Sequence, residues 1–291
     1  MREGSFSAAA RSLRLAQPSV SDQVRRLEAE LNTRLLMSTR RGVTLTAEGR
    51  LFYLHAQLVL TGVDAAAASV GAGPGKGAGT FRLGLTGNAP YYPVLELAAL
   101  ILGAEPDLNL RFPGQNSSLV AKEVRAANLQ AGIVILPIDP DGLDIRPLFR
   151  DEVVLVSADP SRVRRPARIE DLTVAPLILY DSTAGFEDPT RRQLAARAQA
   201  AELALMPQFE VERPETALQF AAHGLGDTIA ARALTRSASF PSNLGYVRFA
   251  DPLYDNFALI TRAGMVPTVL QQRLALIERW AEALQDMPGG D

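Results

Sequence analysis

The sequence predicts an α+β protein of several domains, in which a helical N-terminal part precedes two small α/β lobes. Three observations support this prediction. Up to about residue 70, apolar side chains recur at helical spacing. Residues 71–80 contain five glycines in ten positions, a composition typical of a flexible joint. From residue 81 onward, strand-like and helix-like runs alternate, which indicates βαβ units and a mostly parallel sheet.

The composition excludes several kinds of site. Of the 291 residues, 47% are apolar and 21% are charged, which are ordinary proportions for a folded protein. There is no cysteine and there are two histidines, which excludes a disulfide framework, a thiolate zinc site and a histidine cage for a metal. No apolar run approaches the ~20 residues of a membrane span, and the first residues lack the apolar stretch of a secretory signal. We therefore expect a cytoplasmic protein without membrane contact, metal or other cofactor.

Charge is distributed unevenly along the chain. The first 50 residues have a net charge of +4 and the remainder a net charge of −6. The first part is therefore suited to face a polyanion, although a chance fluctuation explains the asymmetry equally well.

Two helices with a short break between them are predicted at the start. Apolar side chains recur on one face of residues 6–13, and Ser5 is placed to cap this helix. After an interruption at 14–17, Pro18 fits the first turn of a second helix, which Asn32 can end in a left-handed conformation. A small hairpin is expected at 34–46, and Thr46 caps a long helix that continues to about residue 70.

The alternating part of the chain is divided by the same patterns. Strands are predicted at 81–86, 108–112, 132–136, 176–180, 209–211 and 256–261. Helices are predicted at 92–102, 116–128, 189–205, 214–223 and 266–284. This length of alternating chain suits two lobes.

The two N-terminal helices form a helix-turn-helix pattern, and the detailed sequence is more specific. The strings that carry the similarity are Gly4-Ser5-Phe6-Ser7-Ala8-Ala9-Ala10, Gln17-Pro18-Ser19-Val20-Ser21, Arg26-Leu27-Glu28 and Arg41-Gly42-Val43-Thr44-Leu45-Thr46-Ala47-Glu48-Gly49. They closely resemble the LysR-type transcriptional regulators. The resemblance is strong over residues 4–60 and mostly topological over the rest of the chain.

The resemblance implies a winged helix-turn-helix domain at 1–45, a dimerisation linker helix at 46–70 and a hinge at 71–80. A two-lobed effector domain of periplasmic-binding-protein type would follow, with lobe I at 81–157 and 254–291 and lobe II at 158–253. The family's first helix is nearly absent, because only three residues precede Gly4. Either the start site is wrongly assigned or the DNA-binding domain is truncated.

A homodimer or homotetramer that binds double-stranded promoter DNA and responds to a small-molecule effector is the function that the resemblance implies. The second helix would enter the major groove, and its polar side chains would contact bases or phosphates. The hairpin arginines would contact phosphate or the minor groove. The expected DNA-binding residues are Gln17, Pro18, Ser19, Ser21, Gln23, Arg25, Arg26, Arg40 and Arg41.

Effector residues are expected where strands end and helices begin, because ligands of open α/β sheets bind there. The resemblance places such positions in a cleft between the lobes. The candidates are Thr86, Asn88, Asn116 and Ser117 from lobe I, and Ser182, Thr183 and Thr228 from lobe II. Ordinary capping explains any one of these side chains as well. The expected polarity suits a small carboxylate.

Two other functions are compatible with parts of the sequence. A solute-binding protein of periplasmic type, without DNA-binding activity, would have the same two lobes, but the helix-turn-helix pattern and the missing signal stretch disfavour it. An enzyme is disfavoured because no glycine-rich phosphate loop, metal-ligand spacing or nucleophile–base set is recognisable. We therefore expect a regulator and not an enzyme.

Overall fold

The computed structural model describes residues 5–39, 42–53, 55–56, 59–60, 63, 79–87, 91–264 and 266–285. The chain forms two compact units, Met1–Gly71 and Ala72–Asp291, and each is described by itself. Among the described residues, no helix has the length and apolar character needed to cross a membrane.

The first unit contains the predicted helix pair and hairpin. Helix α1 spans Phe6–Leu13 and α2 spans Gln17–Glu30. Strands β1 (Leu36–Thr39) and β2 (Gly42–Leu45) pair antiparallel, and residues 47–53 are helical. The Ser5 side chain accepts a hydrogen bond from the Ala8 N–H, and Asn32 has a φ of 48°. The expected cap and left-handed helix end are thus confirmed.

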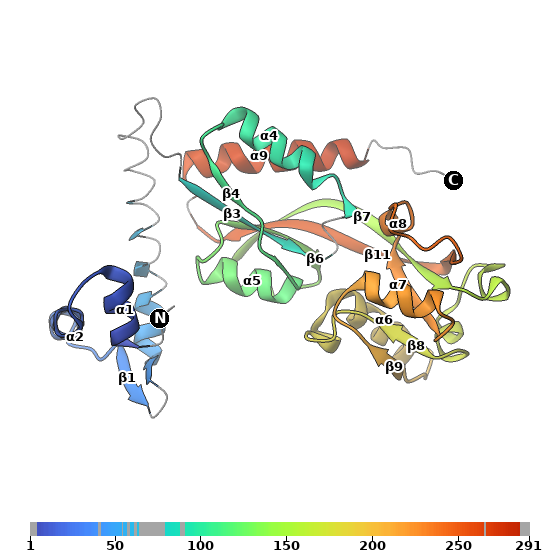
Figure 1. Ribbon diagram of the computed structural model, residues 1–291, viewed down its shortest axis with the longest axis horizontal. Helices are drawn as coiled ribbons and strands as arrows, with labels where there is room; N and C mark the ends of the chain where they lie inside the picture. The colour runs from blue at the N-terminus through green and yellow to red at the C-terminus, as the bar shows by residue number, and fades with distance from the viewer. Residues whose placement is uncertain are drawn as a thin grey trace. The chain divides into compact units, whose positions relative to one another are not determined.

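The second unit contains a nine-stranded sheet with the order β4-β3-β6-β11-β7-β10-β8-β9, in which β5 pairs with β3 (Figure 1). The strands are β3 (Thr80–Thr86), β4 (Asn109–Arg111), β5 (Gly114–Gln115), β6 (Ala131–Leu136), β7 (Leu143–Ser157), β8 (Leu177–Leu179), β9 (Pro207–Glu210), β10 (Asp227–Ala231) and β11 (Gly245–Arg262). The helices are α4 (Val94–Ala104), α5 (Ser117–Arg125), α6 (Pro189–Ala200), α7 (Pro214–Ala222), α8 (Arg232–Thr235) and α9 (Thr268–Gln285). Short 3-10 helices span Pro160–Val163, Ile169–Thr173 and Gly185–Glu187.

The prediction of a mostly parallel sheet is wrong for the centre of this sheet. Strand β3 is parallel to β4, β5 and β6, and β8 is parallel to β9 and β10, as βαβ units require. The two longest strands, β7 and β11, instead pair antiparallel with each other along most of their length. Strand β7 was not predicted, and only the end of β11 was.

Two lobes are built on this sheet. In lobe I, helices α4 and α9 cover one face and α5 covers the other (Figure 1). The first face buries Phe81, Leu97 and Leu274, and the second buries Val120 and Val134. Lobe II has its own core, formed around β8 and β10 with α6 and α7. Strands β7 and β11 run from one lobe into the other and therefore connect them.

The predicted lobe boundary needs one correction. Residues 153–157 were assigned to lobe I, but Val153, Val154, Leu155 and Val156 are buried in the lobe II core. Leu148, earlier on the same strand, belongs to the lobe I core. The boundary falls inside β7 because one continuous strand contributes to both cores.

Candidate DNA-binding and effector sites

The outer face of α2 presents most of the expected DNA-binding side chains. Val20 on the opposite face is buried, with 8% of its surface exposed, and faces the interior of the first unit. Pro18 lies in the first turn, as predicted. Six of the residues expected on this helix are exposed and Ser21 is half-buried; the exposed ones are Gln17, Pro18, Ser19, Gln23, Arg25 and Arg26.

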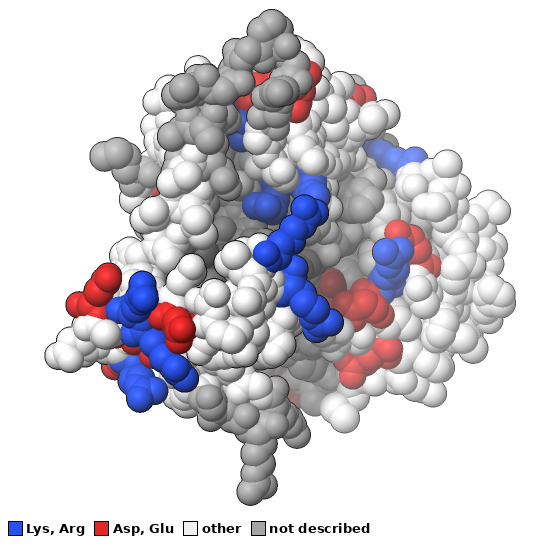
Figure 2. Space-filling model, turned by 60° about the vertical axis from the view of Figure 1, so that its left-hand side comes forward, with Lys and Arg blue, Asp and Glu red and all other residues white. Residues whose placement is uncertain are grey.

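Charge on this face is mixed rather than uniformly basic. The Arg25 guanidinium lies 3.6 Å from the Asp22 carboxylate, one turn earlier, and both side chains are largely exposed. The side of the molecule that Figure 2 draws likewise carries basic side chains, some of them next to acidic ones. An exposed pair of this kind contributes little to stability. Arg25 is thus free to exchange Asp22 for a phosphate or a base.

The hairpin is attached to α2 by the Glu28 carboxylate, for which the sequence predicted no contact. Glu28 Oε1 accepts hydrogen bonds from the backbone N–H groups of Leu35 and Leu36, at 2.7 and 2.9 Å. It therefore fixes the start of β1 against the last turn of α2. Arg40 and Arg41, the expected phosphate contacts, lie outside the described residues.

A second polar contact attaches the following helix to the hairpin. The Thr46 hydroxyl donates to the Arg34 carbonyl at 2.7 Å and accepts from the Gly49 N–H at 2.8 Å, which confirms its predicted capping role. A Cβ on Gly49 would lie 1.9 Å from the Leu35 carbonyl oxygen, so only glycine allows this close approach. The motif Thr46–Gly49 thus fixes the angle between hairpin and helix.

In lobe I the structure brings two predicted effector residues together, but as a buried pair. Ser117, the first residue of α5, donates its hydroxyl hydrogen to Thr86 Oγ1 at 3.2 Å and accepts from the Ile135 N–H at 3.0 Å. The exposed fractions of Ser117 and Thr86 are 1% and 5%. The Ser117 hydroxyl therefore joins β3, α5 and β6.

Asn116 caps α5 and retains a polar atom without a partner. Its Oδ1 accepts from the N–H groups of Ser118 and Leu119, as expected for a cap. Its Nδ2 is buried and makes no hydrogen bond within the described structure. Asn88 lies outside the described residues.

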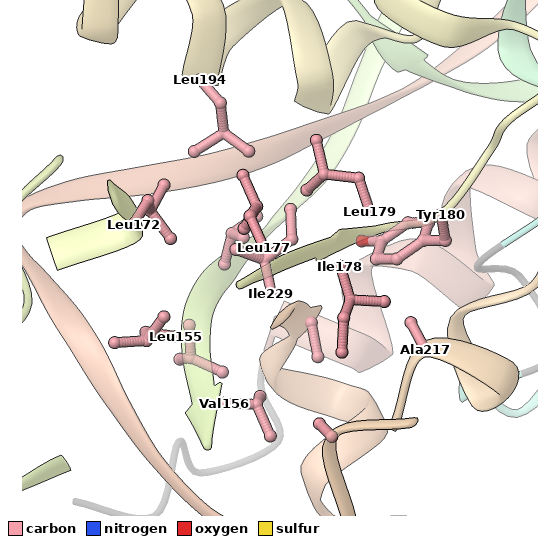
Figure 3. Close-up of a cluster of buried hydrophobic side chains, with 14 of the residues drawn as sticks. Leu155, Val156, Leu172, Leu177, Ile178, Leu179, Tyr180, Leu194, Ala217 and Ile229 are labelled. Atoms are coloured by element: carbon pink, nitrogen blue, oxygen red, sulfur yellow. The ribbon is translucent and has the colours of Figure 1, made fainter. Parts of the chain in front are cut away.

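In lobe II, β8 ends at Leu179 and Tyr180 closes the core (Figure 3), so the next residues lie at the edge of the sheet. Ser182 and Thr183 both bind Glu212, whose Oε2 accepts from their hydroxyls at 2.9 and 2.7 Å. The hydrogen bond from Thr183 lowers the pKa of Glu212. Sequence reasoning missed Glu212, because its partners are about thirty residues away along the chain.

Thr228 is unsuited to its expected role. It lies inside β10, it is 0% exposed, and its hydroxyl donates to the Ile178 carbonyl at 2.9 Å. The residue satisfies a strand carbonyl in the lobe II core and has no surface for a ligand.

Acidic side chains gather where the lobes meet. A Cβ on Gly87, directly after β3, would lie 3.9 Å from Asp181 Oδ1 of lobe II. Burial, together with the nearby charges of Asp188, Glu212 and Asp255, raises the pKa of Asp181 to about 8. Burial also raises the pKa of Asp188, which caps α6. At neutral pH Asp181 therefore holds its proton in most molecules, and its carboxyl group can donate a hydrogen bond.

The lobes are in contact in this structure. Tyr91, which follows β3, packs against the lobe II core, and its pKa is raised by burial and by a hydrogen bond to Glu215 of α7. The Ser118 hydroxyl donates to the Glu187 carbonyl at 3.3 Å. These contacts join residues that follow β3 and begin α5 in lobe I to α7 and to residues before α6 in lobe II.

Comparison with known proteins identifies the family. Residues 1–50 match the family model "Bacterial regulatory helix-turn-helix protein, lysR family", and residues 74–284 match "LysR substrate binding domain". The chain is 27% identical over 277 residues to the HTH-type transcriptional regulator IlvR of Caulobacter vibrioides, covering 94% of this chain and 92% of that protein. It is 30% identical over 250 residues to a "Probable hydrogen peroxide-inducible genes activator" of Mycobacterium avium, covering 85% of this chain and 79% of that protein.

A solved structure has the same fold along nearly the whole chain. Full-length OxyR from Pseudomonas aeruginosa, in a variant form, superposes with a TM-score of 0.68 at 23% identity, covering 98% of this chain and 93% of that one. Both family models and the full-length likeness agree with the helix-turn-helix unit and the two lobes described above. The chain therefore belongs to the LysR family of bacterial transcriptional regulators.

Proposed function

We propose that this regulator reads promoter DNA with the outer face of α2 and that a small molecule bound in its second unit changes that reading. The observation that carries the proposal is the two-sided character of α2, which buries Val20 and exposes Gln17, Ser19 and Gln23. A helix with this division has the form of a recognition helix in the major groove. Promoter DNA as target places the action of the protein in the cytoplasm.

Different residues would contact the bases and the phosphates of the DNA. Gln23 can form two hydrogen bonds to an adenine, and Arg25 can do the same to a guanine once it leaves Asp22. Arg26 on the helix, with Arg40 and Arg41 from the hairpin, supplies sequence-independent contacts to phosphates. The contacts of Glu28 hold the start of β1 against α2.

Effector binding is proposed for the cleft between the lobes. Asn116 Nδ2, at the start of α5, is a buried donor without a partner among the described residues, and Asp181 of lobe II lies beside Gly87 at the end of β3. Because the raised pKa of Asp181 keeps its carboxyl group mostly protonated at neutral pH, both groups can donate to a ligand that carries an acceptor. The hydroxyls of Ser182 and Thr183 could donate to the ligand only after breaking their hydrogen bonds to Glu212. Ligand contacts from both lobes favour the closed arrangement, and this differential affinity is what shifts a two-state protein.

Self-association is proposed for the helix that begins after Thr46. Its described residues include several large apolar side chains that the first unit leaves exposed: Leu51, Val59, Leu60 and Val63. An apolar stripe of this kind is stable in water only when a partner covers it. A second copy of the helix, in a homodimer or within a homotetramer, is the simplest partner.

DNA binding is tested with labelled duplexes from the region upstream of the gene. Fluorescence anisotropy at physiological salt should give a dissociation constant at least about a thousandfold lower for one upstream fragment than for random DNA of equal length. A higher salt concentration should weaken binding to the upstream fragment and to random DNA, because contacts to phosphates release counterions from the DNA. Equal affinity for all duplexes would reject the proposal.

A further inference from the structure

A pocket with a basic side chain lies on the strands that connect the lobes. Its volume is about 510 Å³, within the range of small-molecule sites. Its lining includes Leu136 of β6, Pro147 and Arg150 of β7, and Asn256 of β11; Leu136 is half-buried and the other three are exposed. None of the expected effector residues lines it. The pocket is therefore distinct from the acidic cleft in both residues and charge.

Strand register explains how these side chains converge. Asn256 lies opposite Leu136 on one side and opposite Arg150 on the other, so all three point to the same face of the sheet. It is the face covered further along by α5, since Leu136 packs against the cluster that contains Val134. The neighbouring Phe149 and Phe257 stack on the opposite face, with ring centroids 4.5 Å apart.

Arg150 is held in place without being neutralised. Its guanidinium lies 4.6 Å from the centre of the Tyr254 ring, and in the described part of the chain it has no carboxylate within ion-pair distance. Stacking on a ring face leaves the N–H edges of the guanidinium available. The Asn256 amide lies directly across the strand pair; its Nδ2 donates one hydrogen to the Tyr254 carbonyl at 3.4 Å and has a second hydrogen to offer.

We infer that this pocket binds a small organic carboxylate with an apolar body. A guanidinium edge matches a carboxylate with two parallel hydrogen bonds. Leu136, Pro147 and the strands behind them provide apolar contact for the rest of the molecule. Because β7 and β11 contribute side chains to the cores of both lobes, the bound carboxylate would contact strands that the two lobes share. The pocket is thus positioned to influence the arrangement of the lobes.

Calorimetric titration of the full chain with phenylacetate tests the inference, with neutral phenylacetamide and inorganic phosphate as comparison probes. Phenylacetate should bind at least tenfold more tightly than either, because only it has both the charge and the apolar body. The titration contains no DNA, so its result does not depend on the proposed promoter binding. Absence of phenylacetate binding, or equal binding of phosphate, would overturn the inference.

Variants then locate the site. Arg150→Gln should weaken phenylacetate binding at least tenfold, and Asn256→Asp should do the same by placing a carboxylate beside Arg150. Arg146→Gln is the matched control, since Arg146 is an exposed arginine of the same strand that pairs with Glu278 at 2.9 Å. Unchanged affinity in Arg150→Gln, or a loss in Asp181→Asn alone, would place the ligand in the cleft and reject the pocket.

Discussion

The two units of the chain are held together in different ways. The described residues of the first unit bury few large apolar side chains, Val20 and Leu35 among them. Polar contacts of Glu28 and Thr46 instead fix how the hairpin is oriented relative to α2 and to the following helix. The second unit has three clusters of buried apolar side chains around one sheet. The difference indicates that the second unit is stabilised mainly by apolar packing, whereas polar contacts have a larger part in the described residues of the first unit.

The largest expected effect concerns association. Leu60→Glu combined with Val63→Glu places charges on the exposed apolar stripe, which should convert the oligomer to monomers in light scattering. DNA affinity should fall by about a hundredfold or more, because two linked recognition helices then act separately. Leu95→Glu, at a residue of α4 that is 83% exposed, should leave both properties unchanged. Oligomers that persist in the double variant would show that the interface lies elsewhere.

Core truncation should separate the two kinds of stabilisation. Leu274→Ala in α9 removes a fully buried side chain and should lower the free energy of unfolding of the second unit by about 2–5 kcal/mol. Leu31→Ala, just after α2, removes a side chain that is 42% exposed and should cost less than about 1 kcal/mol. Calorimetric unfolding of each variant measures the difference. Similar losses would contradict the contrast between the units.

Removing the Glu28 carboxylate should loosen the hairpin. Glu28→Ala leaves the N–H groups of Leu35 and Leu36 without their acceptor, at a cost of about 2 kcal/mol. Amide hydrogen exchange at these two positions should then accelerate about thirtyfold. Glu30→Ala, an exposed neighbour on the same helix, is the control and should leave their exchange rates unchanged. Equal exchange in both variants would mean that Glu28 does not hold the hairpin.

Asp181 should make the second unit less stable as the pH rises. Its pKa is raised from an ordinary value of 3.8 to about 8, so between these values the folded state holds a proton that the unfolded state lacks. Stability therefore falls as pH increases from about 4 to 8. Asp181→Asn should remove part of this fall and raise stability at pH 8.5 by on the order of 1 kcal/mol. Unfolding midpoints that fall equally with pH in both proteins would contradict the assignment.

Patterns within short stretches of sequence predicted those helices and strands that depend mainly on neighbouring residues. The helix pair, the hairpin and strands such as β3 and β6 follow from periodicity and capping residues close in sequence. Strand β7 was missed because Pro147 in its middle reads as a strand breaker, yet a register shift in the pairing of β7 with β11 accommodates it. Strand β10 was also missed, because it is only five residues long and its partners, β7 and β8, lie far away in sequence.

The DNA-binding and effector sites, like the fold, could be predicted from the sequence only in part. The polar face of α2 was visible in the sequence because a helix has a fixed period. The roles of Glu28 and Glu212 were not, since each depends on a partner brought near by the fold. The gathering of acidic side chains was missed for the same reason: Asp181, Asp188 and Asp255 are far apart in sequence or on different elements, and only the fold brings them near one another. Burial of Thr228 likewise depends on β10 being an inner strand.

The central claim, that the α2 face reads DNA sequence, is tested most directly by a base-by-base affinity profile. Each base pair of the upstream site is replaced in turn, and dissociation constants are measured for the wild-type protein, for Gln23→Ala and for the α1 surface control Ser12→Ala. We expect Gln23→Ala to lose about 1–3 kcal/mol of discrimination at one base pair and Ser12→Ala to match the wild type. A uniform loss across all positions, or no loss, would contradict the claim.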